Sequence, residues 1–336
     1  MSDVMIEVQG LTKIYGTYRA IDKVSFEVRK GEVLGFLGPN GAGKTTTMKI
    51  LTCFIAPTDG SAKVNGCDVF EDSLGVRKAI GYLPESTPLY VEMMVLEYLE
   101  WAARMRGLRG EDATKAIKRV VEETSLGDVL AKEIRELSKG YRQRVGLAQA
   151  LIHLPPILIL DEPMSGLDPN QAIEIRDLIT SIGKERTVIL STHNLAEVQV
   201  SCDRAIIIAK GKIVADATPQ QLLDQGGKSR VLVSFLKNGK SDGELREMLG
   251  KVSGADLVRP IDAIQGEIAF EIIPSGSSDI RPAVFRAAVE NNVTLIGLRQ
   301  EGQNLENIFR DLTTSEPQGK SAPKSERPAA SESKDA

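Results

Sequence analysis

The sequence predicts an α/β protein that has a mainly parallel sheet, an inserted helical subdomain and a small α+β domain towards its C-terminal end. Between residues 5 and 225, short β-like runs alternate with helical stretches, which is typical of a parallel sheet covered by helices. Within this part, residues 94–152 are almost wholly helical in pattern. Residues 230–313 have the strand and helix order βαββαβ, which is the order of a ferredoxin-like module.

Each predicted element depends on a local pattern of apolar residues. Strands are expected at the apolar runs 6–8, 24–28, 33–37, 157–160, 188–190 and 205–209. Run 157–160 is apolar at every position, as in a strand that is buried on both faces. Two stripes at helical spacing support the helical block, namely Leu96, Leu99 and Ala103, and then Ile117, Val120, Val121 and Thr124. We therefore expect a helical subdomain over about residues 86–152.

The same sequence signals predict the domain boundaries. A first domain is expected over residues 4–226 and a second over 230–313, with Gly226 and Gly227 at the boundary. A late apolar stripe belongs either to the core or to a contact with a second copy, and its members are Leu305, Ile308, Phe309 and Leu312. Residues 315–336 contain no aromatic or branched aliphatic side chain, so burial cannot offset the entropy cost of ordering them. We expect this tail to be disordered.

The composition argues against several classes of protein. Forty-two Lys and Arg against 46 Asp and Glu give a net charge of −4 over 336 residues, which disfavours a polyanion-binding surface spread over the whole molecule. The longest apolar runs are far shorter than the roughly 20 residues that cross a bilayer, and residues 1–8 show no secretory signal. Cys53, Cys67 and Cys202 have no disulfide or metal-site spacing, which fits a reducing cytoplasm.

The strongest local motif predicts a phosphate-binding loop. Residues 38–46 fit GxxxxGK[ST] and stand between an apolar strand and a helix that we expect from Thr46 onward. Glycines let the backbone aim its N–H groups at a phosphate, and the helix adds the positive end of its dipole. The candidate nucleotide-binding residues are Gly38, Pro39, Asn40, Gly41, Ala42, Gly43, Lys44, Thr45 and Thr46. Lys44 suits the β- and γ-phosphates of ATP, and the Thr45 hydroxyl suits Mg²⁺.

A pair of carboxylates follows the apolar run 157–160. Because ligands bind at the carboxyl ends of the strands in an open parallel sheet, we expect Asp161 and Glu162 to lie beside the phosphate-binding loop. Asp161 is then placed to hold Mg²⁺, and Glu162 to polarise a water molecule for attack on the γ-phosphate. Asp-Glu-Pro after a strand is usually a solvated turn, so this interpretation depends on the upstream loop.

Four further segments resemble those of ABC-transporter ATPases. Residues 137–144, LSKGYRQR, resemble the signature segment, and residues 165–169, SGLDP, resemble the D-loop. Residues 191–194, STHN, resemble the segment with the switch histidine, and residues 11–16, LTKIYG, resemble the adenine-stacking loop. Every motif stands in the order of that family, over residues 6–225. The resemblance implies an ABC ATPase domain of the P-loop NTPase class.

The resemblance also implies roles for individual residues. Tyr15 would stack on adenine, and His193 would contact the γ-phosphate and help to position the water. Ser138 and Gly140, expected just before a helix over 142–152, would contact the γ-phosphate held by a second copy. Asp168 of the D-loop is a further candidate nucleotide-binding residue. Two chains would thus close head-to-tail over two ATP molecules, as a homodimer or pseudo-dimer.

The sequence departs from the usual family pattern at two places. The usual signature is LSGGQ, and here Lys139 replaces its first glycine while Tyr141 replaces its glutamine. The retained serine and glycine should still bind an anion. Glu85 stands where most members carry glutamine, and it is a candidate Mg²⁺ ligand. A carboxylate only accepts hydrogen bonds and adds negative charge, so Glu85 either strengthens metal binding or lowers the affinity for ATP.

The family also meets its membrane partner just after Glu85. An apolar patch there is either that contact or core of the helical subdomain, and its members are Tyr90, Met93, Met94 and Leu96. The resemblance thus implies separate integral-membrane permease subunits and a place on the cytoplasmic face of the membrane. No nucleic acid is expected as a partner.

The C-terminal extension, the variant signature and residues 82–85, YLPE, look most like drug-export and gliding-motility ATPases of the ABC-2 type. The leading hypothesis is therefore the ATP-hydrolysing subunit of an export complex. The alternative is a soluble ABC ATPase that acts on the ribosome or on nucleic acid. A single phosphate loop argues against the fused ribosome factors, and the short interval from Thr46 to Asp161 argues against the coiled coils of DNA-repair members. A pseudo-ATPase would lack a catalytic group, whereas the expected lysine, carboxylates and histidine are all present.

Overall fold

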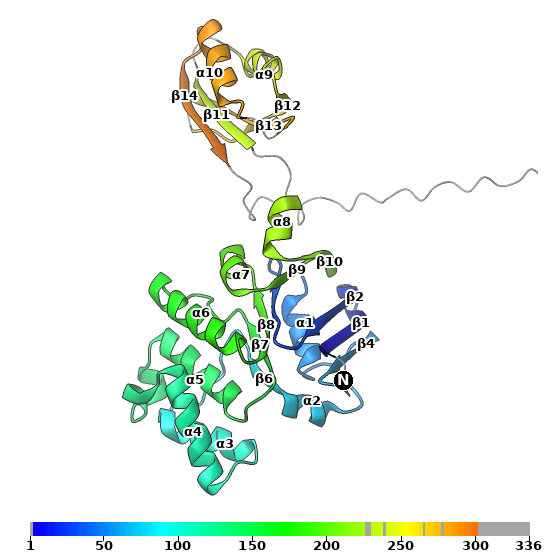
Figure 1. The fold of residues 1–336 in the computed structure, drawn as a ribbon, viewed down its shortest axis with the longest axis vertical. Helices are drawn as coiled ribbons and strands as arrows, with labels where there is room; N and C mark the ends of the chain where they lie inside the picture. The colour runs from blue at the N-terminus through cyan, green and yellow to red at the C-terminus, as the bar shows by residue number, and fades with distance from the viewer. Residues whose placement is uncertain (1–2, 226–229, 238–239, 265, 277–278, 302–336) are drawn as a thin grey trace, which may run out of the picture.

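The structure is a computed structural model that describes residues 3–225, 230–237, 240–264, 266–276 and 279–301. Its central sheet has six strands in the order β10-β9-β3-β8-β7-β6 (Figure 1). The strands are β3 (Val33–Leu37), β6 (Ile80–Leu83), β7 (Ile157–Asp161), β8 (Thr187–Thr192), β9 (Arg204–Ala209) and β10 (Lys212–Ala217). All neighbouring pairs are parallel except β9 with β10. The predicted α/β class is confirmed.

A second sheet corrects the prediction of one mainly parallel sheet. It has four antiparallel strands, β2 (Tyr18–Arg29), β1 (Val4–Tyr15), β4 (Asp59–Val64) and β5 (Cys67–Asp68). The predicted runs 6–8 and 24–28 lie in β1 and β2 rather than in the parallel sheet. Along β2, buried and exposed residues alternate, which is the pattern of an antiparallel sheet with one solvated face.

Helices and the second sheet cover both faces of the central sheet, which explains the continuous apolar run in β7. Leu158 and Leu160 pack in a cluster with the helices of residues 95–183. Ile157 and Ile159 pack in a cluster with the helix of residues 44–51 and the antiparallel sheet. The helices outside the helical block are α1 (Lys44–Leu51), α2 (Ser73–Ala79), α6 (Pro169–Gly183), α7 (Leu195–Ser201) and α8 (Pro219–Gln225).

The predicted helical block contains α3 (Val95–Met105), α4 (Gly110–Thr124), α5 (Lys139–Leu151) and two short 3-10 turns, Gly127–Val129 and Ile134–Glu136. Of the predicted stripes, Leu99, Val120 and Thr124 are buried, whereas Leu96 is 39% exposed. The expectation of a helix from residue 142 was wrong by one turn. Because the Ser138 hydroxyl accepts a hydrogen bond from the Tyr141 amide, α5 begins at Lys139 and Gly140 lies in its first turn.

The C-terminal residues form a separate sheet with its own apolar cluster. Its elements are β11 (Arg230–Leu236), α9 (Asp242–Gly250), β12 (Ala255–Ile261), β13 (Glu267–Pro274), α10 (Arg281–Glu290) and β14 (Leu295–Glu301). The sheet is antiparallel in the order β12-β13-β11-β14. The boundary glycines, the apolar stripe over 305–312 and the predicted tail over 315–336 lie outside the described residues.

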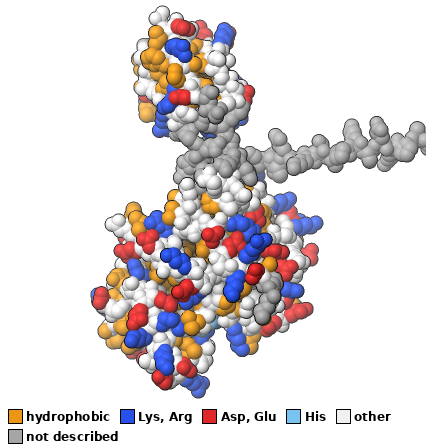
Figure 2. Space-filling view, in the orientation of Figure 1, with side chains coloured by type: hydrophobic (Ala, Val, Ile, Leu, Met, Phe, Trp, Pro, Cys, Tyr) orange, Lys and Arg blue, Asp and Glu red, His pale blue; other side chains and the backbone are white. Residues whose placement is uncertain are grey.

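Two features bear on contacts with charged partners and with a membrane: the distribution of surface charge, and the length and apolarity of the helices. On the face drawn in Figure 2, basic and acidic side chains are interspersed over the N-terminal sheets and helices. Among the described residues, no helix is both long enough and apolar enough to span a membrane.

Candidate nucleotide-binding site

A cavity of about 250 Å³ lies at the carboxyl ends of β3, β7 and β8. Eleven of the predicted site residues line it, and these are Tyr15, Pro39, Asn40, Gly41, Gly43, Lys44, Thr45, Thr46, Glu85, Glu162 and His193. Three residues that the sequence analysis missed also line it: Tyr18, Ala20 and Ser165. Five predicted binding residues and one predicted metal ligand do not, namely Gly38, Ala42, Ser138, Gly140, Asp168 and Asp161. The tertiary structure thus brings the phosphate-binding loop together with Glu85, Glu162 and His193.

The loop has its shape because two of its glycines have no room for a side chain. A Cβ atom on Gly38 would lie 2.5 Å from the carbonyl oxygen of Ile208. Gly43 has a φ of +112°, and a Cβ atom there would lie 2.7 Å from the carbonyl oxygen of Ala20. Gly43 is the residue that precedes α1, so the helix begins at Lys44 and not at Thr46 as expected. Ala42 is buried behind the lining, where its amide donates a hydrogen bond to the Pro39 carbonyl.

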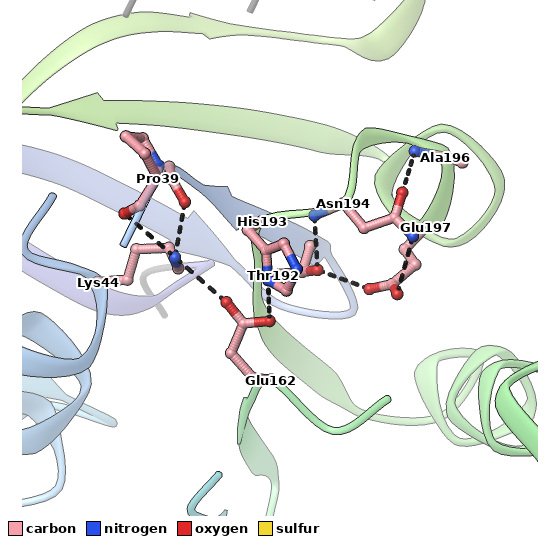
Figure 3. Close-up of polar contacts among 9 residues, drawn as sticks. Pro39, Lys44, Glu162, Thr192, His193, Asn194, Ala196 and Glu197 are labelled. Atoms are coloured by element: carbon pink, nitrogen blue, oxygen red, sulfur yellow. Dashed lines mark hydrogen bonds and ion pairs between the residues drawn. The ribbon is translucent and has the colours of Figure 1, made fainter. Parts of the chain in front are cut away.

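Lys44, Glu162 and His193 form a chain of polar contacts across the pocket (Figure 3). The Lys44 ammonium Nζ lies 3.2 Å from Oε1 of Glu162 and donates a 2.6 Å hydrogen bond to the Gly38 carbonyl. The other carboxylate oxygen of Glu162, Oε2, lies 2.7 Å from Nδ1 of His193. Lys44 and Glu162 are buried, whereas the imidazole of His193 is 56% exposed. Both carboxylate oxygens of Glu162 are therefore engaged.

Glu162 reaches this position through an unusual backbone conformation. Its φ is +51°, in the left-handed region that non-glycine residues seldom adopt, directly after the last residue of β7. Its amide donates a 2.9 Å hydrogen bond to the Ser191 carbonyl at the end of β8, which holds the turn. Strained residues of this kind persist where the surroundings fix them, and they cluster at functional sites.

The residues behind the pocket fit a magnesium ion. Asp161 is 1% exposed, and neither of its carboxylate oxygens has a hydrogen-bond partner. The buried hydroxyl of Ser191, its neighbour across β7 and β8, is also unpartnered. Burial raises the pKa of Asp161, and the nearby Ser191, Thr45 and Lys44 oppose this shift while Glu162 adds to it. Thr45 in α1 and Glu85 in the loop after β6 line the pocket and offer further oxygen atoms, and oxygen is the ligand that Mg²⁺ prefers.

Two tyrosines stand at the open side of the pocket. Tyr15 and Tyr18 are cross-strand partners at the hairpin between β1 and β2, and they are 47% and 58% exposed. The Lys13 ammonium lies 5.3 Å from the ring centre of Tyr15, and the Tyr18 hydroxyl donates a 3.3 Å hydrogen bond to the Gly41 carbonyl. A two-residue hairpin turn would have predicted that Tyr18 lies opposite Tyr15. Both rings are available for stacking on a base.

The remaining predicted residues are structural within this chain. Ser138 caps α5, and Asp168 caps α6 by accepting a 2.9 Å hydrogen bond from the Gln171 amide. Gly140 is buried, and a Cβ atom on it would contact the side chain of Gln171. One chain therefore does not bring its signature segment to its own phosphate-binding loop.

Comparison with known proteins decides the family. The family model described as ABC transporter matches residues 21–165. The ABC transporter ATP-binding protein YxlF of Bacillus subtilis is 34% identical over 307 residues, which cover 91% of this chain and 98% of that relative. The chain belongs to the ABC transporter ATP-binding proteins.

Two further similarities extend this assignment. The daunorubicin resistance ATP-binding protein DrrA3 of Streptomyces coeruleorubidus is 32% identical to this ABC protein and aligns with 93% of the chain and 97% of the relative. The dimeric structure of MJ0796, a bacterial ABC transporter cassette, superposes with a TM-score of 0.59 at 25% identity, over 64% of this chain and 99% of that one. The predicted family and the predicted ATPase activity are confirmed.

Proposed function

We propose that this ABC protein is the ATP-hydrolysing subunit of an ABC-2 type exporter, which drives separate membrane subunits through ATP-dependent, head-to-tail dimerisation. One observation carries the proposal. The pocket contains the phosphate-binding loop, Lys44, Glu162 and His193, whereas Ser138 and Asp168 lie outside it. A second copy would supply these two residues. The near full-length similarity to a drug-resistance protein supports export as the direction of transport.

The contacts in the pocket suggest an order of events when ATP enters. The phosphates compete with Glu162 for the Lys44 ammonium, because both are anions and Lys44 has one charge to pair. Once released, the Glu162 carboxylate is free to accept a proton from the attacking water. His193 already touches Glu162 through Nδ1, and its exposed ring would donate to the γ-phosphate. Thr45, Asp161 and Glu85 would hold Mg²⁺, which neutralises charge on the phosphates.

The dimer would complete each site from two chains. The solved dimer of a related cassette shows that this fold can pair. Only a ligand that binds the open and closed arrangements with different affinity can shift the equilibrium between them. ATP meets this condition if it bridges Lys44 of one chain and Ser138 of the other.

The test of the proposal is dimer formation by the Glu162→Gln variant, which binds ATP but turns it over slowly. Light scattering on a size-exclusion column should give twice the monomer mass with ATP and Mg²⁺, and the monomer mass without nucleotide. The double variant Lys44→Ala, Glu162→Gln is the matched control and should stay monomeric. A Glu162→Gln protein that binds ATP and stays monomeric would contradict the proposal.

The contact with the membrane subunits is proposed at the apolar patch beside Glu85. Tyr90, Met94 and Leu96 are 51%, 43% and 39% exposed, which favours an interface over core, whereas Met93 is partly buried against the core of α3 to α5. Tyr90 packs edge-on against Trp101, with ring centres 4.9 Å apart. Leu96→Glu should reduce co-purification of an integral-membrane protein while the ATPase activity of the isolated chain is unchanged. Recovery of ribosomes from the same membranes would contradict the export role.

We propose that residues 4–226 are the ATP-binding domain and that residues 230–313 are a ferredoxin-like domain. The order βαββαβ and the strand order β12-β13-β11-β14 support the second assignment. The proposed contact with the membrane subunits lies in the first of these domains. It would make the protein a peripheral protein on the cytoplasmic face of the membrane.

A further inference from the structure

A closed ring of hydrogen bonds surrounds the backbone that carries His193. The Thr192 hydroxyl donates a 2.6 Å hydrogen bond to Oε2 of Glu197, and the Asn194 side-chain amide donates a 3.2 Å bond to Oε1. The Asn194 backbone amide in turn donates a 3.0 Å bond to the Thr192 hydroxyl. Figure 3 shows Glu197 joined to the residues on both sides of His193. The ring is distinct from the contact between His193 and Glu162.

The ring is built on two firm supports. Thr192 is the last residue of β8 and is 1% exposed, so its hydroxyl is fixed by the sheet. Glu197 stands in the first turn of α7, and Asn194 caps the same helix by accepting a 3.0 Å hydrogen bond from the Ala196 amide. Glu197 therefore ties the start of the helix to the end of the strand.

Glu197 is an unusual choice for a purely structural position. Within the part of the chain that the structure describes, its two oxygens accept only from the Thr192 hydroxyl and the Asn194 amide, and no lysine or arginine pairs with it. Burial raises the pKa of Glu197 and the negative charge of Glu162 adds to this shift, whereas the hydrogen bonds from Thr192 and Asn194 and the nearby His193 oppose it. Burying part of a carboxylate without a cation costs stability, and the two hydrogen bonds to Glu197 offset this cost only in the ring arrangement.

We propose that Glu197 is a positioning residue for His193, because it holds the residues before and after the histidine and so fixes the direction of the imidazole. This inference rests on the proposed function, in which His193 acts on the γ-phosphate. The His193 ring is 56% exposed and stands in the short connection between β8 and α7, so packing alone does not fix it. If the hydrogen bonds among Thr192, Asn194 and Glu197 are lost, the 2.7 Å contact with Glu162 still restrains the imidazole of His193, but the backbone on either side of it is no longer held.

The test compares the steady-state ATPase kinetics of six variants with those of the wild-type chain. Glu197→Ala and Thr192→Val break the ring, and Thr192→Ser keeps the hydroxyl. Gln199→Ala, at an exposed position on α7, is the matched control. We expect kcat to fall about 10- to 100-fold in the first two, because small misplacements of a catalytic group have effects of that size. KM for ATP should change less than twofold, and Thr192→Ser and Gln199→Ala should retain wild-type kcat.

Two further variants, His193→Ala and the double variant His193→Ala, Glu197→Ala, distinguish a positioning role of Glu197 from a general loss of structure. In the His193→Ala background, Glu197→Ala should cause no further loss of kcat, because it acts through a side chain that is already absent. Wild-type kcat in Glu197→Ala or Thr192→Val, a rise in KM alone, or an equal further loss in the His193→Ala background would each overturn the inference. Full activity of His193→Ala alone would instead overturn the proposed role of His193, so the two failures are distinguishable.

Discussion

The Lys44 ammonium lies between two oxygen acceptors, 3.2 Å from the Glu162 carboxylate and 2.6 Å from the Gly38 carbonyl. In this arrangement, the ammonium proposed to bind phosphate neutralises the carboxylate proposed to activate water. Because Lys44 and Glu162 are both buried, solvent screens their attraction far less than that of a surface pair. The Glu162 carboxylate is therefore held on both sides, by Lys44 and by His193.

This relationship predicts that Glu162→Gln binds ATP more tightly than the wild-type chain. The neutral amide competes less for Lys44 and repels the phosphates less, so we expect the Kd for ATP to fall about 3- to 10-fold, about 1 kcal/mol. Turnover should fall at least 100-fold, because general-base catalysis contributes about that much. Calorimetric titration with ATP and Mg²⁺ measures the affinity. An unchanged Kd would show that the Lys44–Glu162 pair does not persist in solution.

Removal of the ammonium should have the opposite effect on binding. In Lys44→Ala we expect ATP affinity to fall at least 100-fold and turnover to be lost, because no other lysine or arginine lines the described pocket. Fluorescence of a labelled ATP analogue measures the binding. Lys49→Ala, at an exposed position on the same helix, is the control and should bind normally. Wild-type affinity in Lys44→Ala would mean that the phosphate site lies elsewhere.

The loop geometry makes Gly38 sensitive to a single added carbon atom. In Gly38→Ala the new Cβ atom would lie 2.5 Å from the Ile208 carbonyl, so the loop or β9 must shift. We expect a loss of about 1–3 kcal/mol in the free energy of unfolding and at least a tenfold weaker binding of ATP. Gly127→Ala is the control, since a Cβ atom at Gly127 meets no atom within 4 Å. Urea unfolding and ATP titration of both variants test this, and equal behaviour of the two would contradict it.

The half-buried His153 predicts a pH dependence of stability. Its Nε2 donates a 3.0 Å hydrogen bond to the Ile80 carbonyl, and Nδ1 has no partner. Burial, together with the positive charges of Arg106 and Arg119, lowers the pKa of His153 to about 4. The unfolded chain, with a histidine pKa of about 6.5, binds more protons between pH 4 and 6.5, so the free energy of unfolding falls as the pH is lowered through this window.

His153→Gln removes this titration and keeps a donor for the Ile80 carbonyl. Between pH 7.5 and pH 5.0 the wild-type chain should lose about 1–2 kcal/mol more unfolding free energy than the variant. Urea unfolding of both proteins at the two pH values measures the difference. Parallel losses in the two proteins would show that His153 titrates normally in the folded state.

The sequence predicted most of the pocket because its motifs are contiguous. The spacing of Gly38, Gly43 and Lys44 is a recognisable contiguous motif, and the all-apolar run before Asp161 marks a strand buried on both faces. Tyr18 was missed, although it lies opposite Tyr15 across a hairpin turn, because the antiparallel sheet was not predicted. Ser191 stands in the motif over residues 191–194, but its unpartnered hydroxyl beside Asp161 arises only in the folded chain.

The sequence alone thus determined the residue types, the strand and helix that flank the phosphate-binding loop, and the family resemblance, since each depends on local spacing. Only the tertiary structure decided that Lys44 pairs with Glu162, that His193 contacts the same carboxylate, and that Glu197 bridges Thr192 and Asn194. The physical reason is that β3, β7 and β8 are distant in sequence and end side by side only when the parallel sheet forms. The contacts across their ends are then set by packing and not by sequence spacing.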